Sequence, residues 1–235
     1  MKKKISLHEH VFPIEKIIKK LKKEENPMNT EIETQNILGG VHHVTAITSS
    51  AQKNYDFFTN ILGLRLAKLT VNQDDYETYH LYFTGEDGKS PNMTFFDFKD
   101  IPKGMHGANN IKRASFRVPS DASLTYWTER FEKAHVKHGE INVKFGKKTL
   151  EFEDFDGQKY QLISDQDNTG DAALDRSWLL SNVAPEHGII GMGPVFVKVT
   201  DTYNLRIILE TVFGFRYAGQ ENNLHLFSHL SHLLF

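Results

Sequence analysis

Hydrophobic and polar positions along the chain follow two periods, one typical of strands and one typical of helices. Residues 39–48 form a β-branched run that predicts a strand. Residues 51–62 space their apolar side chains three and four positions apart, which predicts a helix with Ser50 as N-cap and Gly63 as C-cap. Three strand-like runs follow, at residues 64–71, 78–84 and 92–98. The pattern therefore predicts one βαβββ unit.

The same order of elements recurs further along the chain. A second copy is predicted as a strand, a helix and three strands at residues 111–118, 120–134, 141–145, 148–154 and 158–164. Asp156 and Gly157 predict a hairpin turn between its last two strands. A third copy is predicted as a strand, a helix capped by Asp201, and further strands at residues 190–199, 203–212, 215–218 and 224–227. The similar junctions NILGLRL and TVFGFRY, at residues 60–66 and 211–217, indicate an internal repeat.

Composition shifts along the chain predict its domain boundaries. Residues 1–35 are rich in lysine and glutamate and predict a peripheral or disordered N-terminal extension. Residues 36–165 are expected to form one domain of two modules, at 36–100 and 108–165. A linker is predicted at 166–186, and an incomplete third module with an atypical tail at 187–235.

Charge and residue usage exclude several classes of function. A formal net charge of -2 gives no general basic surface, so we expect no nucleic-acid partner. The chain has no cysteine, so any metal must be held by histidine, carboxylates or water, a set that suits Fe(II), Mn(II), Ni(II) or Zn(II). No apolar run approaches the roughly 20 residues that span a bilayer, and no signal peptide is apparent. We therefore predict a cytoplasmic protein with no membrane partner.

The adjacent histidines His42 and His43 are the first candidates for chemistry. Successive residues of a strand point to opposite faces, so His43 would share a face with Thr45 and Ile47, and His42 would point the other way. On spacing alone, a core or edge histidine with satisfied hydrogen bonds is the commoner interpretation. A metal ligand needs further support from context.

Four segments supply that context: residues 40–46 (GVHHVTA), 62–66 (LGLRL), 70–75 (TVNQDD) and 78–83 (TYHLYF). They resemble the hydroquinone-type ring-cleaving dioxygenases of the vicinal oxygen chelate superfamily, which also includes glyoxalase I and the bleomycin-resistance proteins. The resemblance covers about residues 38–227. It implies an α+β fold of repeated βαβββ modules, in which mixed, curled sheets form a cup and the helices lie outside.

The resemblance also implies a site. His43 corresponds to an iron ligand, and His42 and Thr45 to pocket residues, around Fe(II) or Mn(II) and a small aromatic diol or quinone. The family's second histidine and its glutamate come from a final module that this chain does not show. We therefore expect a C-terminally truncated member with an incomplete metal site. An uncovered sheet face would favour a homodimer.

Other donors within the chain are weighed against this expectation. His80 is a further pocket candidate, and the remaining candidate donors are His106, Glu151, Glu153, Gln161, His229 and His232. No acid–base catalyst is assigned. Three functions stay open: a ring-cleaving dioxygenase, a metal-free binding module of the bleomycin-resistance type, and a glyoxalase-type isomerase or lyase. Phosphate-binding and serine-hydrolase motifs are missing from the chain.

Overall fold

The computed structural model describes residues 41–88, 93–98, 101–168 and 176–228. All of them belong to one compact unit, residues 37–235. The predicted extension at residues 1–35 and the tail from residue 229 lie outside the described residues. Among the described residues, no helix is both long enough and apolar enough to cross a membrane.

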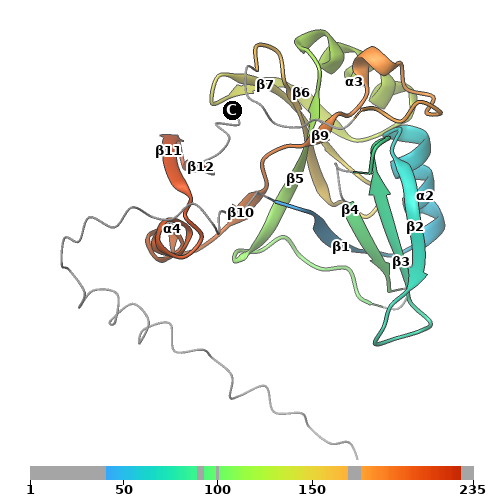
Figure 1. The fold of residues 1–235 in the computed structure, drawn as a ribbon, viewed down its shortest axis with the longest axis horizontal. Coiled ribbons are helices and arrows are strands. Elements are labelled where there is room, and N and C mark those ends of the chain that lie inside the picture. The colour runs from blue at the N-terminus through green and yellow to red at the C-terminus, as the bar shows by residue number, and fades with distance from the viewer. Residues whose placement is uncertain (1–40, 89–92, 99–100, 169–175, 229–235) are drawn as a thin grey trace, which may run out of the picture. The chain divides into compact units, whose positions relative to one another are not determined.

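The first module has the predicted βαβββ order (Figure 1). Its sheet has the strand order β1-β4-β3-β2, with β1 parallel to β4 and the other neighbours antiparallel. The elements are β1 (Val44–Thr48), α2 (Ala51–Tyr55), η2 (Asp56–Ile61), β2 (Arg65–Val71), β3 (Tyr79–Thr84) and β4 (Met93–Asp97).

The predicted helix at residues 51–62 is not one continuous α-helix. The Ser50 side chain caps α2 by accepting from the Lys53 N–H, as predicted, but the winding then widens into the π-helical turn η2. This turn buries Phe57, Phe58 and Thr59 in succession, which regular α-helical spacing would not do. Gly63 follows with a φ of 73°, consistent with the predicted glycine stop.

The second module repeats the arrangement, with the strand order β5-β8-β7-β6 and β5 parallel to β8. Ser120 caps its helix, and Gly157 adopts a φ of 77° in the predicted hairpin turn. The elements are β5 (Asn110–Val118), α3 (Asp121–Lys133), β6 (His138–Lys144), β7 (Lys147–Glu153) and β8 (Lys159–Ser164).

The third copy departs from the prediction at its first strand. Residues 190–199 form two short strands instead of one, β9 (Gly191–Met192) and β10 (Phe196–Lys198), and both pair with β5. The break falls at Gly193, where a Cβ atom would lie 3.0 Å from Ser115 and Ile163, and at Pro194, which has no N–H for a sheet. The short helix η3 (Pro185–His187) lies at the end of the predicted linker. The third copy continues with α4 (Thr202–Thr211) and the hairpin of β11 (Arg216–Glu221) and β12 (Leu224–Ser228).

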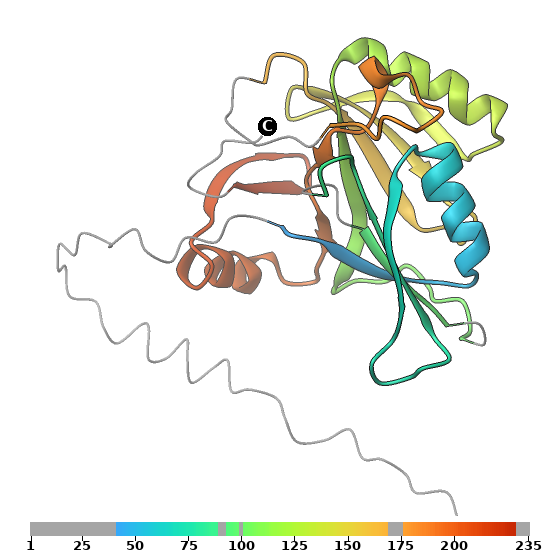
Figure 2. The same cartoon turned by 45° about the vertical axis from the view of Figure 1, so that its right-hand side comes forward.

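The hydrophobic core lies between the sheets and their helices. Helix α2 runs along the first sheet and α3 along the second (Figure 2). The ring centroid of Phe58 lies 4.9 Å from that of Phe83 and 4.7 Å from that of Phe95, both in its own module. It lies 5.8 Å from the ring centroid of Tyr160 in the second module. The core is therefore continuous across both modules. The predicted α+β class is confirmed, and each sheet keeps a second face away from its helix.

Candidate functional site

The histidine pair lies just before the strand that was predicted to contain it. Strand β1 begins at Val44, one residue after His43, and both histidines are exposed. Backbone pairing between β1 and β4 begins at Val44 and Met93. Met93 is the first described residue of β4, so this part of the strand has no residue that could pair with His42 or His43. The Nδ1 atoms of His42 and His43 lie 2.9 Å apart, which engages one ring nitrogen of each residue.

The face of the first sheet opposite its helix carries polar and aromatic side chains. Val44 and Thr48 are buried toward the core, whereas Thr45 and Ile47 are exposed on the other side. Register across the sheet aligns Thr45, Thr94 and Tyr82 in one row, and Ile47, Phe96 and His80 in the next. We call this surface the open face, and define it as Thr45, Ile47, His80, Tyr82, Thr94 and Phe96.

His80 is held tightly within the open face. Its Nδ1 lies 2.8 Å from the Tyr82 hydroxyl, and its ring centroid lies 4.1 Å from that of Tyr82 and 3.9 Å from that of Phe96. Its Nε2 is buried and has no hydrogen-bond partner in the structure of the described residues. Burial lowers the pKa of His80, and the nearby charges of His43 and Lys68 lower it further. Burial therefore favours the neutral form of the ring, and Nε2 has no partner among the described residues.

Thr45 is placed on the open face as predicted, and it bonds to the neighbouring strand. Its Oγ1 lies 2.9 Å from Oγ1 of Thr94. Lys68, on β2, places its ammonium 5.4 Å from the ring centroid of Tyr82. The open face thus combines flat apolar rings with hydroxyl, imidazole and ammonium groups.

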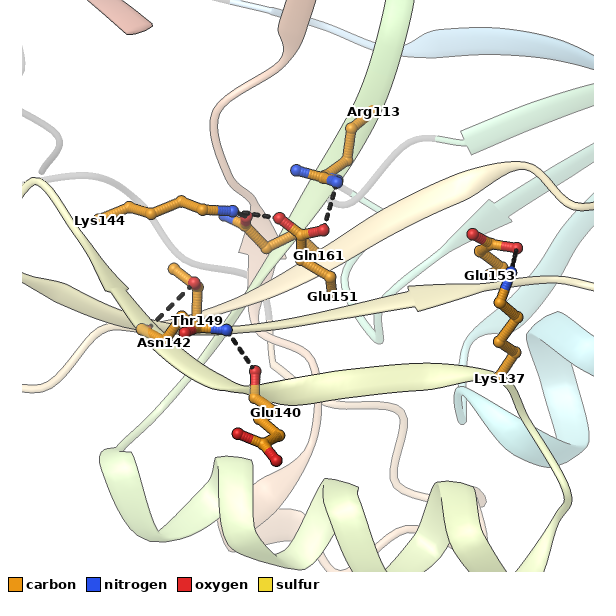
Figure 3. A network of polar contacts seen from close by, with 9 residues as sticks. All are labelled: Arg113, Lys137, Glu140, Asn142, Lys144, Thr149, Glu151, Glu153 and Gln161. Carbon is orange, nitrogen blue, oxygen red and sulfur yellow. Dashed lines mark hydrogen bonds and ion pairs between the residues drawn. The ribbon is translucent and has the colours of Figure 1, made fainter. Parts of the chain in front are cut away.

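The corresponding face of the second sheet is filled by its own side chains. Arg113 Nη2 lies 2.5 Å from Glu151 Oε2, and Lys144 contacts both the other oxygen of Glu151 and, at 2.9 Å, Gln161 Oε1 (Figure 3). The Phe196 ring lies over both cations, 5.4 Å from the guanidinium carbon of Arg113 and 5.7 Å from Lys144 Nζ. We call these residues, Arg113, Lys144, Glu151, Gln161 and Phe196, the closed face.

Charge balance holds the closed face together. Burial opposes ionisation of Glu151, but the hydrogen bond from Lys144 and the charges of Arg113 and Lys144 outweigh it, so the pKa of Glu151 is lowered. The Arg113 side chain is only 8% exposed, so it depends on this carboxylate for its neutralisation. Glu151 and Gln161, two candidate metal ligands, are therefore committed to internal contacts.

A turn of the second module is hydrogen-bonded to the end of β1, the strand that follows the histidine pair. Asp156 accepts hydrogen bonds from the Thr48 hydroxyl at 2.8 Å and from the Ser49 N–H at 3.0 Å, and also from the Ser49 hydroxyl. Gln158 donates from Nε2 to the carbonyl of Ile47. We call this contact between the β7–β8 turn and the end of β1 the junction.

The junction is supported by a buried acid. Asp154 accepts from the backbone N–H groups of Asp156 and Gln158, and from the Tyr160 hydroxyl at 3.0 Å. Burial raises the pKa of Asp154 to about 6, despite these hydrogen bonds. The position of β1 therefore depends on a turn that is built around a titratable group.

The other candidate donors do not join His43. His106 is exposed and its Nε2 lies 3.1 Å from the carbonyl oxygen of Gly157, while Glu153 pairs with Lys137. His229 and His232 lie outside the described residues. Over the ranges that the structure describes, no group of three histidine or acidic side chains could hold a metal ion. The described residues therefore do not by themselves fit the family's three-ligand site, and the metal role of His43 stays a prediction.

Several contact residues were not identified from the sequence. Tyr82 stands two positions after His80 and so shares its strand face, a signal that was available. Arg113, Lys144 and Asp156 gave no comparable local signal, because their partners are distant or lie on other strands.

Comparison with known proteins adds a family match and named relatives. Residues 40–162 match the model of the Glyoxalase/Bleomycin resistance protein/Dioxygenase superfamily. MhqA of Bacillus subtilis (strain 168), which is named as a ring-cleaving dioxygenase, is 36% identical over 186 residues, covering 78% of this chain and 58% of that protein. The chlorohydroquinone/hydroquinone 1,2-dioxygenase of Sphingobium indicum is 36% identical over 135 residues, covering 56% of this chain and 41% of that protein.

A solved structure shows the same arrangement. A crystal structure from Bacillus subtilis subsp. subtilis str. 168, described as that of a dioxygenase, superposes with a TM-score of 0.74 at 30% identity. The match covers 83% of this chain and 61% of that one. The chain thus spans less than two thirds of the length of each of these relatives.

Proposed function

The chain belongs to the Glyoxalase/Bleomycin resistance protein/Dioxygenase superfamily, and from this premise we propose that it is a protein of the ring-cleaving dioxygenase type whose ligand is a small aromatic diol or the related quinone. The names of its relatives support this proposal, one of them for hydroquinones. The observation that carries it is the open face, where aromatic rings lie with a few polar groups, among them His80, which is near enough to His43 for that charge to lower its pKa. That mixture suits a hydroxylated aromatic ring.

We assign His43 as one metal ligand, with His42, Thr45 and His80 as pocket residues. Nδ1 of His43 faces His42, so Nε2 is the atom available for a metal. Fe(II) is the metal we propose, with Mn(II) as the alternative, because open sites of two histidines and one carboxylate suit both. The described residues supply only part of such a set. No reaction step is therefore derived through the metal.

Metal retention tests the role of His43. The full chain is loaded with Fe(II) under argon, desalted and analysed for iron, and oxygen uptake is then followed with hydroquinone. We expect His43→Gln to lower iron retention by at least about tenfold, since even outer-shell partners of a metal ligand carry effects of that size. The matched control is His225→Gln, an exposed histidine on the β11–β12 hairpin. Equal iron retention in the wild type and His43→Gln would exclude His43 as a ligand.

A metal-free binding module is the second candidate function. It is favoured by one observation, the lack of a three-donor cluster among the described side chains. Binding of hydroquinone without iron retention and without oxygen uptake would select this function over the dioxygenase. A glyoxalase-type isomerase would need the same convergent ligands, and no contact in the structure favours it. A cytoplasmic location and a homodimer both stay predictions.

A further inference from the structure

The unused nitrogen of His80 is the strongest unexplained feature of the open face. An imidazole has two ring nitrogens, and Tyr82 engages only Nδ1. Nε2 is shielded from solvent and lacks a partner among the described residues, a condition that costs stability in a folded protein. Each such group in a native structure needs an explanation, and a bound water, ion or ligand that supplies the missing bond is one.

We propose that His80, Tyr82 and Phe96 form a seat for the aromatic ring of the ligand, in which Nε2 of His80 bonds a ring hydroxyl without any need for a metal. This inference rests on the proposed function for the class of ligand, and goes beyond it by assigning the hydroxyl contact to His80 instead of to a metal. Either tautomer of His80 fits. If Nε2 lacks the proton, it accepts a hydrogen bond from a phenol hydroxyl. If Nε2 carries the proton, it donates a hydrogen bond to a phenol or phenolate oxygen.

The surroundings of His80 fix its ring in place. Tyr82 and Phe96 flank it with centroid distances of 4.1 and 3.9 Å, and the Tyr82 hydroxyl holds Nδ1 at 2.8 Å. A ring fixed on both faces and at one nitrogen loses little conformational entropy when the other nitrogen binds. The orientation of the ring is therefore fixed, and a ligand hydroxyl reaches Nε2 once the groups that shield it from solvent move aside.

The charge around the seat also suits a phenol. The Tyr82 hydroxyl and the two flanking rings give His80 a mixed apolar and polar environment that suits a neutral phenol. Lys68 lies over the Tyr82 ring and provides the positive charge that a phenolate would require. Both protonation states of the diol are thereby accommodated.

The second sheet offers no equivalent seat. Its cations face Glu151 and Gln161, and Phe196 lies over them. A ligand there would have to displace internal ion pairs. Nε of Arg113 and Oγ of Ser115 are also buried without a partner among the described residues, but Phe196 covers the Arg113 guanidinium. A ligand on the open face would not have to displace the ion pairs that fill the closed face.

Binding under metal-free conditions tests the seat. Hydroquinone is titrated into the full chain under argon with EDTA present, and the dissociation constant is measured by calorimetry while the side-chain ¹⁵N resonances of the histidines are followed by NMR. We expect saturable binding that shifts the Nε2 resonance of His80. The ether 1,4-dimethoxybenzene keeps the ring but cannot donate a hydrogen bond, so binding that is about tenfold weaker identifies Nε2 as the acceptor, and equal binding identifies it as the donor.

Two substitutions and a control make the assignment specific. His80→Phe keeps a flat ring but removes Nε2, and we expect a loss of affinity of about tenfold. His80→Gln retains a polar end group near the position of Nε2, so it should recover part of the affinity and also guards against misfolding of the phenylalanine variant. His225→Phe makes the same exchange at an exposed site on another sheet and should bind as the wild type does.

The outcomes separate this inference from the proposed function. No binding in EDTA, or equal binding by the wild type and His80→Phe, would overturn the seat even if iron retention depends on His43. Conversely, metal-free binding that depends on His80, with no dependence of iron retention on His43, would support the seat and refute the metal assignment.

Discussion

The open face and the closed face occupy corresponding positions in two modules with the same strand order. In the first module the face opposite the helix exposes Thr45 and Ile47, and Nε2 of His80 has no partner within the part of the chain that the structure describes. In the second module the same position contains Arg113, Lys144 and Glu151, which neutralise one another beneath Phe196. The two cations of the closed face are neutralised internally, although Nε of Arg113, like Nε2 of His80, is buried without a hydrogen-bond partner among the described residues. We therefore expect the ion pairs of the closed face to stabilise the fold, and we propose the open face for binding.

The largest effect is expected where the closed face is broken. Glu151→Ala leaves Arg113, whose side chain is only 8% exposed, without a counter-charge. Breaking a buried pair costs about 3–5 kcal/mol, and we expect about 2–4 kcal/mol here because the Glu151 side chain is 38% exposed and water can enter. Urea denaturation at neutral pH measures the change.

A second ion pair on the same strand provides the control. Glu153 pairs with Lys137, whose side chain is 78% exposed. Glu153→Ala should therefore cost at most about 1 kcal/mol, as surface pairs do. If both variants lost the same stability, the closed face would have no special role.

The next effect is a dependence on pH at the junction between the two modules. Burial raises the pKa of Asp154 to about 6 from its ordinary 3.8, so the folded state binds a proton more tightly than the unfolded chain does. The stability contributed by this carboxyl is therefore fully present below about pH 4 and is lost as the pH rises through 6. This pKa shift corresponds to a change of at most about 3 kcal/mol in the free energy of unfolding.

Asp154→Asn isolates this group from the other acids. Asparagine has nearly the same shape and does not titrate, so the difference in unfolding free energy between wild type and variant should change by about 2–3 kcal/mol between pH 4 and 7. Denaturant melts at several pH values provide the measurement. A difference that stays constant across this range would show that Asp154 titrates normally in the folded protein.

A smaller effect is expected from uncovering the closed face. Phe196→Leu keeps an apolar side chain but removes the ring over Arg113 and Lys144. The loss should be about 0.5–2 kcal/mol, the range of a partly desolvated cation–π contact. Phe213→Leu, at a ring that is 44% exposed after α4, is the control and should change stability by less. Equal effects would remove the argument that Phe196 stabilises the two cations.

The parts of the fold that depend on local chemistry were predictable. Ser50 and Asp201 were expected to cap helices, and each accepts a hydrogen bond from the backbone N–H three residues ahead. The hairpin at Gly157 followed from its turn residues. The prediction of one continuous strand at residues 190–199 was wrong. It followed the apolar pattern and gave too little weight to Gly193 and Pro194, where the strand is interrupted.

The contacts that define the two faces were harder to predict. Arg113 meets Glu151 from 38 positions away, and Thr48 meets Asp156 from 108 positions away. The strand predicted at residues 148–154 is present as β7, but its prediction did not reveal the partners of Glu151. His80 was recognised as a pocket candidate, but the unused nitrogen became apparent only after Tyr82 and the buried environment were located.

The smallest effect on stability is expected at His80, and its direction is informative. His80→Phe removes a buried nitrogen that has no partner among the described residues and keeps the stacking against Tyr82 and Phe96. Replacing an unsatisfied polar group with an apolar one of similar shape is close to neutral or stabilising, so we expect a change within about 1 kcal/mol in thermal or urea melts. The Tyr82 hydroxyl loses its bond to Nδ1 but is on a partly exposed residue that water can reach. A loss above about 2 kcal/mol would mean that His80 stabilises the fold as Glu151 does, and the two faces would then no longer differ in the way their contacts indicate.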